Sequence, residues 1–244
     1  MWHLDRRTRI VGIIRGGSRA TTATLARELG VSRETVRRDL LSLEAEGLVQ
    51  RVHGGAIAPE GSEEAPFDRR RRVFWSEKIA IGRKAARIIA DGQIVFIDAG
   101  TTTLAFAEAL ADRPSVKVVT NSIGVAQRLG SQAVLLGGSI NSDVPATFGE
   151  LTLAEIERFQ TDIAFISPVA IEPSAGVMNF ALHEAEIARA MIRGAGKTAL
   201  LADHSKFGTR SRVNICRLDA IDIIVTDRPP GPAYDSIVER VVCD

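Results

Sequence analysis

The 244-residue sequence predicts an α/β protein made of two domains that differ in charge and in pattern. Residues 1–75 carry 14 cations, all of them arginine, against 10 acidic residues, whereas residues 76–244 carry 17 cations against 20 acidic residues. From about residue 75, short runs of Val, Ile and Leu alternate with helical stretches, which is typical of a parallel sheet covered on both faces. A basic first part indicates a nucleic-acid-binding module joined to a second domain.

The composition predicts an ordinary globular protein, because 45% of the residues are hydrophobic and 25% are charged. No apolar run approaches the roughly 20 residues of a membrane helix, and no apolar signal-peptide core opens the chain. The two cysteines, Cys216 and Cys243, are not spaced as metal ligands or as a CxxC pair. They predict inert thiols in a reducing compartment, so we expect a cytoplasmic protein without a membrane partner.

The N-terminal segment predicts a winged helix-turn-helix, because helix signals and turn residues alternate at short spacing. The expected helices are residues 4–14, residues 23–29 capped by Thr22, and residues 33–44 capped by Ser32. A turn at Gly30 joins the second helix to the third. Alternation over residues 48–52, followed by Gly54 and Gly55, predicts the β-hairpin wing.

The third helix is basic on its outer face, and the N-terminal part of such a helix reads bases in the major groove of double-stranded DNA. Arginine can donate two hydrogen bonds to guanine, and side chains of the wing can contact the DNA backbone or minor groove. The expected DNA-binding residues are Ser32, Arg33, Glu34, Thr35, Arg37, Arg38, Arg51, His53 and Gly54. The alternative is that Arg37 and Arg38 form ion pairs within the helix, with Glu34, Asp39 or Glu44.

Residues 58–75 differ in composition from the segments on either side and predict a linker between a domain of residues 1–57 and a domain of residues 76–244. The segment contains Pro, Gly, Ser and Glu and then the arginine run 69–72. That run fits a solvated surface, a contact to DNA or a contact to the second domain.

The second domain is expected to be α/β with a mostly parallel sheet. The expected strands are residues 94–97, 116–119, 133–136, 163–166, 198–201 and 223–225, and the expected helices are residues 78–89, 104–110, 123–129, 152–159 and 184–193.

Polar residues follow several of these strands, at the edge where parallel sheets bind ligands. Residues 98–103 leave a strand and open a helix, where backbone N–H groups and threonine hydroxyls suit a phosphate. Lys206 can supply a positive charge, Asp203 can accept from hydroxyls, and glycine allows close backbone approach. The expected effector-binding residues are Asp98, Gly100, Thr101, Thr102, Thr103, Thr120, Asn121, Gly137, Gly138, His183, Glu184, Asp203, Ser205 and Lys206. For His183 and His204 a purely structural role is an equal alternative.

Neither a GxxxxGK[ST] nor a GxGxxG nucleotide loop occurs in the sequence, and no cluster of residues has metal-ligand spacing. We therefore expect no cofactor, no metal and no catalytic residue.

Several segments together resemble the DeoR-type bacterial transcription regulators. They are residues 31–40, 43–44, 51–56, 77–80, 98–102, 119–122, 136–138 and 203–207. The resemblance implies a repressor, occasionally an activator, whose winged helix binds operator DNA. It also implies a C-terminal domain that resembles sugar-phosphate isomerases and binds a phosphorylated metabolite as inducer, in a homodimer or homotetramer.

Within the family, further residues resemble the branch that regulates glycerol metabolism, so glycerol 3-phosphate is the best expected effector. They are His183-Glu184, residues 203–208, Val213-Asn214, and Thr226-Asp227 before Pro229-Pro230. The sequence departs from the family at residues 167–170, Ser-Pro-Val-Ala, where a glycine-containing loop is usual.

Two alternatives from other classes stay open. In the first, the larger domain is an active sugar-phosphate isomerase or deaminase, with Asp98, Asp203 or Glu184 as general base and Lys206 as phosphate partner. In the second, the chain is a purely architectural DNA-binding protein, which leaves the polar strand ends without a role.

Overall fold

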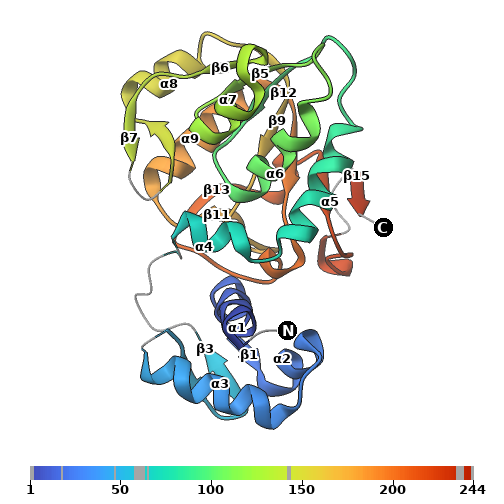
Figure 1. Ribbon diagram of the computed structural model, residues 1–244. Coiled ribbons are helices and arrows are strands. Elements are labelled where there is room, and N and C mark those ends of the chain that lie inside the picture. Colours follow the sequence, from blue (N-terminus) through green and yellow to red (C-terminus); the bar gives the residue numbers. More distant parts are fainter. Residues whose placement is uncertain are drawn as a thin grey trace. The chain divides into compact units, whose positions relative to one another are not determined.

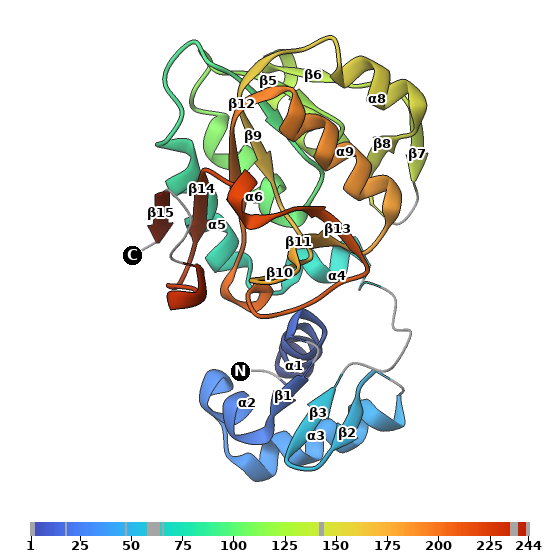
Figure 2. The same ribbon diagram turned by 180° about the vertical axis from the view of Figure 1, so that it is seen from behind.

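A computed structural model describes residues 3–17, 19–46, 48–57, 64, 66–141, 144–234 and 239–242 (Figures 1 and 2). The chain divides into two compact units, residues 1–73 and residues 74–244. Helix α4 (Phe67–Arg72) lies within the segment predicted as linker, and helix α5 (Trp75–Ala86) begins at the last residue of that segment. The side chain of Phe67 is buried, and the guanidinium carbon of Arg70 lies 5.6 Å from the centroid of its ring. Helix α4 is therefore held in place by a buried apolar residue.

The first unit is a helix-turn-helix with a three-stranded antiparallel sheet, in the strand order β1-β3-β2. Its elements are α1 (His3–Gly17), β1 (Arg19–Thr21), α2 (Thr22–Leu29), α3 (Arg33–Ala45), β2 (Gln50–Val52) and β3 (Gly55–Ile57). Its core is formed by apolar side chains that recur at helical spacing: Ile10, Ile14, Leu25, Leu29, Val36, Leu40 and Leu43. The predicted winged helix-turn-helix is confirmed.

Three details of the first unit differ from the prediction, and the first is that the turn of the wing is formed by His53 and Gly54, because Gly55 already belongs to β3. The N-cap of α2 is Thr21 and not Thr22, because the Thr21 hydroxyl accepts from the Thr24 N–H at 3.1 Å. Strand β1 was not predicted, since three residues are too few to show an alternation. It packs closely on β3, where a Cβ on Gly55 would lie 2.1 Å from the Ala20 carbonyl oxygen. Only glycine fits at that position.

The second unit is built around a seven-stranded sheet in the order β15-β14-β12-β9-β4-β5-β6, in which every neighbouring pair is parallel. The strands are β4 (Ile94–Ile97), β5 (Lys117–Thr120), β6 (Ala133–Leu135), β9 (Thr161–Ile166), β12 (Ala195–Leu201), β14 (Ile223–Thr226) and β15 (Glu239–Val242). The first six confirm the predicted strands within a few residues, and β15 was not predicted.

Helices cover both faces of this sheet (Figures 1 and 2). Helices α5, α6 (Thr101–Leu110) and α7 (Ile123–Leu129) pack on one face through Ile81, Phe106 and Val125. Figure 2, seen from behind, shows α9 (Leu182–Arg193) in front of the other face, and α8 (Glu150–Ile156) contacts α9. The mostly parallel sheet of an α/β domain is thus confirmed.

Several short elements complete the second unit and were not predicted. They are the hairpin β7 (Ser139–Asn141) and β8 (Ala146–Phe148), the antiparallel strands β10 (Ala170–Glu172), β11 (Gly176–Asn179) and β13 (Val213–Cys216), and the 3-10 helices η1 (Gly130–Gln132), η2 (His204–Lys206), η3 (Leu218–Ala220) and η4 (Pro232–Tyr234). Cys216 is a free thiol whose pKa is raised to about 12 by burial, and Cys243 lies outside the described residues. In the described part of the chain, every helix is too short or too polar to cross a membrane.

Helices α5 and α6 approach each other closely at Gly82. A Cβ there would lie 2.7 Å from the Phe106 Cα and 2.9 Å from the Ala105 carbonyl oxygen. Beyond the C-terminal end of α6, Arg113 donates to the carbonyl oxygens of Ala86 and Ile89 at 2.6 and 2.7 Å. The two helices therefore form one packed layer and run in the same direction.

We predict that Gly82→Ala destabilises the second unit, although alanine favours a helix by roughly 0.5–1 kcal/mol over glycine. The added methyl meets backbone that cannot move aside, at a typical cost of about 1–3 kcal/mol. Gly124→Ala in α7 is the control, because its methyl would meet the flexible end of Leu104 at 3.1 Å. Urea unfolding measures both, and a Gly82→Ala protein as stable as the wild type would contradict the prediction.

Candidate DNA-binding surface and effector site

Helix α3 has the features of a recognition helix. Its N-cap is Ser32, whose hydroxyl accepts from the Thr35 N–H at 3.1 Å, as predicted. Its apolar residues Val36, Leu40 and Leu43 are buried, whereas Arg37 and Arg38 are exposed to solvent. Of the predicted DNA-binding residues, Thr35 is half-buried and all the others are exposed.

Two of the three acidic residues that Arg37 and Arg38 might pair with are bound to other partners. Asp39 is 2% exposed and accepts from Arg6 of α1 at 2.6 and 3.1 Å. Glu44 accepts from the backbone N–H of Arg51 at 2.9 Å. Within the described ranges no ion pair involves Arg37 or Arg38, which disfavours the structural alternative and leaves both guanidinium groups available to DNA.

The wing lies beside α3 (Figure 2), and its turn contains Gly54, whose φ of +81° favours glycine. The Thr22 N–H at the start of α2 donates to the Gly54 carbonyl oxygen at 2.9 Å. Arg51 lies 3.5 Å from Glu44, and His53 is exposed at the turn. The predicted residues on α3 and on the wing therefore belong to one packed unit.

The register of the parallel sheet brings the predicted effector residues to one edge of the second unit. Ile97 pairs with both Thr120 and Phe165, and Leu200 pairs with Ile166. The residues that follow these strands lie in the order Gly137, Asn121, Asp98, Ser167, Asp203 across that edge, with Asp227 after β14 beyond them. These side chains come from distant parts of the sequence, and the sheet topology alone makes them neighbours.

Asp98 is the most perturbed group at this edge. Its side chain is 3% exposed, and burial raises its pKa to about 8. The N–H of Ala99, which donates to it at 2.8 Å, opposes this rise, and the negative charge of Glu184 in α9 adds to it. Asp98 is therefore mostly protonated at neutral pH and can donate a hydrogen bond without repelling an anion.

The threonines of the site divide into two groups. The hydroxyl of Thr103 donates to the Gly100 carbonyl oxygen at 3.1 Å, and that of Thr120 donates to the Ile97 carbonyl oxygen at 2.6 Å. These two hydroxyls fix the loops after β4 and β5. Thr101 and Thr102 are buried in the first turn of α6, where the helix presents its N–H groups.

Asn121 has an unusual hydrogen-bonding environment. It is fully buried, and its side-chain nitrogen donates to the Thr147 carbonyl oxygen at 3.3 Å. Its Oδ1 atom has no hydrogen-bond partner among the described residues. Burying an acceptor without a donor costs about 1–3 kcal/mol, so a ligand hydroxyl or a water at this position would be stabilising.

Gly137 and Gly138 have a structural explanation of their own. The Gly137 N–H donates to Glu155 of α8 at 2.5 Å, and a Cβ on Gly138 would lie 2.1 Å from the Thr152 hydroxyl oxygen. The close backbone approach expected here is therefore an approach to α8. It does not depend on a ligand.

The remaining predicted residues lie on α9 and η2. His183 is exposed and packs edge-on against Phe148, with ring centroids 4.7 Å apart. Asp203 is buried and caps η2 by accepting from the Ser205 N–H and hydroxyl at 3.1 and 2.5 Å. Lys206 is half-buried on the same 3-10 helix.

His204 makes structural contacts, which fits the alternative role given for it above. Its Nδ1 lies 2.6 Å from Asp227, and its ring packs edge-on against Phe74 at 4.8 Å. Burial lowers the pKa of His204, but the hydrogen bond and charge of Asp227 outweigh burial and leave that pKa raised. The pair fixes η2 to the end of β14, and with it the backbone of Lys206.

Comparison with known proteins matches each of the two units to a known protein domain. Residues 6–61 match the DeoR-like helix-turn-helix domain, and residues 74–228 match the DeoR C terminal sensor domain. The chain belongs to the DeoR family.

Relatives in the DeoR family match nearly the full length of this chain. The glycerol-3-phosphate regulon repressor of Escherichia coli is 34% identical over 94% of this chain and 93% of its own length. The transcriptional repressor GlcR of Bacillus subtilis is 34% identical over 98% and 94%, and the regulator GlpR of Haloferax volcanii is 33% identical over 91% and 89%.

Solved structures resemble this DeoR-family chain more distantly. Ribose 5-phosphate isomerase A from Methanocaldococcus jannaschii is 16% identical, with a TM-score of 0.40 over 55% of this chain and 54% of that chain. The translation initiation factor eIF-2B from Pyrococcus horikoshii is 15% identical, with a TM-score of 0.45 over 79% and 68%. These similarities concern the fold alone.

Residues 167–170, where the sequence departs from the usual DeoR pattern, lie against the loop that opens α6. A Cβ on Gly100 would lie 2.9 Å from the Ser167 Cβ. The backbone N–H of Val169 donates to the Met178 carbonyl oxygen and to the Asn179 side chain, at 3.0 and 3.1 Å. Ser167 therefore contributes directly to the shape of the expected phosphate loop.

Sequence reasoning gave no role to three residues of the DeoR sensor unit that the structure singles out. Lys78 on α5 is 3% exposed, and a buried cation is uncommon. Phe74 and Asp227 hold His204. For Lys78 the only signal in the sequence was the resemblance of residues 77–80 to the family. Nothing in the sequence near Phe74 indicates that its ring contacts His204.

We predict that Asp98→Asn gains stability relative to the wild type as the pH rises. An unfolded Asp ionises near pH 4, whereas Asp98 stays protonated to about pH 8, so the wild type loses stability across this window. Asparagine does not titrate, so the difference in unfolding free energy should grow by about 1.4 kcal/mol per pH unit. Urea unfolding of both proteins between pH 5 and 7.5 measures it, and a constant difference would show that Asp98 is ionised in the fold.

Proposed function

We propose that this protein is a transcriptional repressor that binds operator DNA through α3 and the wing and is released by a phosphorylated polyol. The observation that carries the DNA-binding part is the exposed pair Arg37 and Arg38, which form no ion pair within the described part of the chain. Membership in the DeoR family and the names of relatives along the full length support repression rather than catalysis. The alternative of an isomerase or deaminase is less well supported, because the Asp203 carboxylate already accepts from Ser205.

Glycerol 3-phosphate is the effector that we propose. The first turn of α6, with Thr101 and Thr102, is suited to the phosphate, and neutral Asp98 does not repel it. The unpartnered Oδ1 of Asn121 suits a hydroxyl of the polyol, which can donate to it. Lys206 supplies a positive charge at the same edge of the sheet, and the relatives named for the glycerol-3-phosphate regulon favour this metabolite.

The mechanism that we propose is a coupling between two binding equilibria. DNA and effector favour different arrangements of the chain, so each weakens the binding of the other by the same factor. A coupling of roughly 1–3 kcal/mol changes the affinity for the operator about 5–150-fold. Two copies on one DNA site would match an operator made of two half-sites.

The first test is fluorescence anisotropy of a labelled fragment of the gene's own upstream DNA at near-physiological salt. We expect preference for this fragment over random DNA and release by glycerol 3-phosphate, while glycerol and inorganic phosphate release little. Equal affinity for random DNA would overturn the repressor. Release by another sugar phosphate alone would keep the repressor and overturn the effector.

Arg37→Ala should weaken operator binding about 5–150-fold, because a good arginine–guanine contact contributes roughly 1–3 kcal/mol. Binding of glycerol 3-phosphate, measured by calorimetry, should be unchanged. Arg27→Ala is the matched control, since Arg27 is an exposed arginine on α2 outside the predicted surface. Equal losses in the two variants would show that Arg37 contributes only general charge.

Lys206→Ala should have the reverse effect, with operator affinity retained and release by glycerol 3-phosphate weakened at least about tenfold, through loss of a charge-assisted contact. Lys197→Ala is the control, because Lys197 is exposed on β12 outside the site. Normal release of the Lys206→Ala protein would place the phosphate elsewhere.

A further inference from the structure

Ser167 lies at the centre of the edge where the effector is expected. It follows β9, which is the middle strand of the seven-stranded sheet, between β4 and β12. Asp98 follows β4 on one side of it, and Asp203 follows β12 on the other. Ser167 therefore lies between two acidic residues of the expected site, although the sequence gave no role to its side chain.

The side chain of Ser167 lies against the loop that opens α6. A Cβ on Gly100 would lie 2.9 Å from the Ser167 Cβ and 3.2 Å from the Ser167 hydroxyl oxygen. It would also lie 3.2 Å from the hydroxyl oxygen of Thr103. The Asp98 N–H donates to the Phe165 carbonyl oxygen at 3.0 Å, so the start of this loop is fixed to β9. The Ser167 hydroxyl is thus held beside the first turn of α6.

The hydroxyl of Ser167 is free to bind a ligand. Ser167 is half-buried, and its hydroxyl makes no hydrogen bond to another residue in the part of the chain that the structure describes. The hydroxyls of Thr103 and Thr120 at the same edge already donate to backbone carbonyl oxygens. A serine hydroxyl can donate one hydrogen bond, so Ser167 has a donor to offer where these two threonines have none.

The two residues after Ser167 offer no backbone donor to a ligand. Pro168 has no N–H, and the N–H of Val169 donates to the Met178 carbonyl oxygen and to the Asn179 side chain. A glycine-containing loop, which is usual here in the family, could instead turn its N–H groups toward a ligand. In this chain the hydroxyl of Ser167 can supply the hydrogen bond that Pro168 and Val169 cannot.

We propose that the Ser167 hydroxyl donates a hydrogen bond to the phosphate of the effector. The first turn of α6 presents backbone N–H groups to an anion, and the Ser167 hydroxyl adds a donor beside that turn. Because a phosphate oxygen carries charge, this hydrogen bond is a strong one. The inference rests on the proposed effector site and adds to it a ligand of the phosphate.

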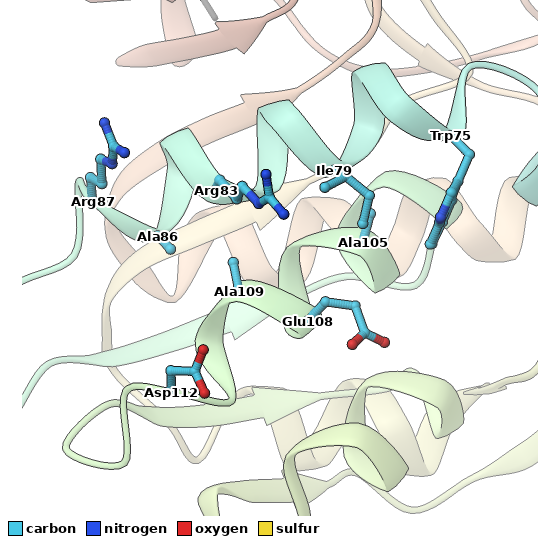
Figure 3. Close-up of a pocket in the computed structure, with 9 residues that line it drawn as sticks. All are labelled: Trp75, Ile79, Arg83, Ala86, Arg87, Ala105, Glu108, Ala109 and Asp112. Atoms are coloured by element: carbon cyan, nitrogen blue, oxygen red, sulfur yellow. The ribbon is translucent and has the colours of Figure 1, made fainter.

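A phosphate fits this edge of the sheet better than it fits the groove of about 600 Å³ between α5 and α6 (Figure 3). Arg83 and Arg87 line the α5 side of that groove and could attract an anion. Glu108 and Asp112 line the α6 side and would repel it. At the effector edge, the raised pKa of Asp98 removes repulsion from the carboxyl group that precedes the α6 loop.

The test measures binding of three phosphate esters to the full chain by calorimetry: glycerol 3-phosphate, ribose 5-phosphate and propyl phosphate. Propyl phosphate carries no hydroxyl, so it reports on the phosphate alone. Ser167→Ala and Ser167→Gly both remove the side-chain hydroxyl. Each should raise the dissociation constant of every ester that the wild type binds by the same factor, about 10–150-fold, which is typical for a lost hydrogen bond to a charged group.

Ser115→Ala is the matched control, because Ser115 is exposed just before β5, at the opposite edge of the sheet. It should bind the esters as the wild type does. Thermal unfolding and operator affinity without effector should be unchanged in all three variants, which separates loss of the ligand contact from loss of the fold.

The outcomes distinguish this inference from the proposed effector. Normal binding by Ser167→Ala, a loss that Ser167→Gly does not share, or a loss confined to the two esters with hydroxyls would overturn the role of Ser167 and leave glycerol 3-phosphate as effector. A wild type that binds ribose 5-phosphate and not glycerol 3-phosphate would overturn the effector alone. A wild type that binds none of the three esters would overturn both.

Discussion

The parallel direction of all neighbouring strands in the large sheet is the constraint on which the second unit depends. Because every strand ends at the same edge, polar residues that follow different strands must meet there. The helices that return the chain cover both faces, so this edge is bordered by apolar layers. Burial of Asp98 is a direct result, and its raised pKa follows mainly from burial, with a smaller contribution from the charge of Glu184.

In the first unit, the distribution of ion pairs determines which charges of helix α3 stay exposed. Helix α3 contains three acidic residues and three arginines, and a helix of that composition could neutralise itself. The fold limits this by placing two of the three acids, Asp39 and Glu44, against arginines of other elements, which are Arg6 and Arg51. The positive charge that remains is concentrated on one face of the helix.

The sequence predicted the elements with strong local signals. Strand β4 and helix α7 match the prediction residue for residue, because a continuous apolar run and a serine cap define them. Strands β1, β7 and β8 were missed, since each has only three residues and is fixed by a distant partner. Helix α4 was read as linker because its arginine run obscured the anchor Phe67.

Prediction of the sites was likewise limited to residues with a local signal in the sequence. Exposed arginines and strand-end residues could be named from local pattern, but the role of a hydroxyl could not. Thr101 and Thr103 look alike in sequence, yet Thr103 is bound to its own loop. The side-chain nitrogen of Asn121 donates to Thr147, which lies 26 residues further along the chain, while Oδ1 has no partner among the described residues. No local pattern in the sequence reveals this arrangement.

The close contact at Gly55 has a mechanical consequence. Strand β1 joins α1 to α2, and at Gly55 it touches β3 with no room for a side chain. The wing therefore cannot tilt without moving the first two helices, and α3 is bound to α1 through Arg6. A force applied to α1 would therefore turn the whole first unit as a rigid body.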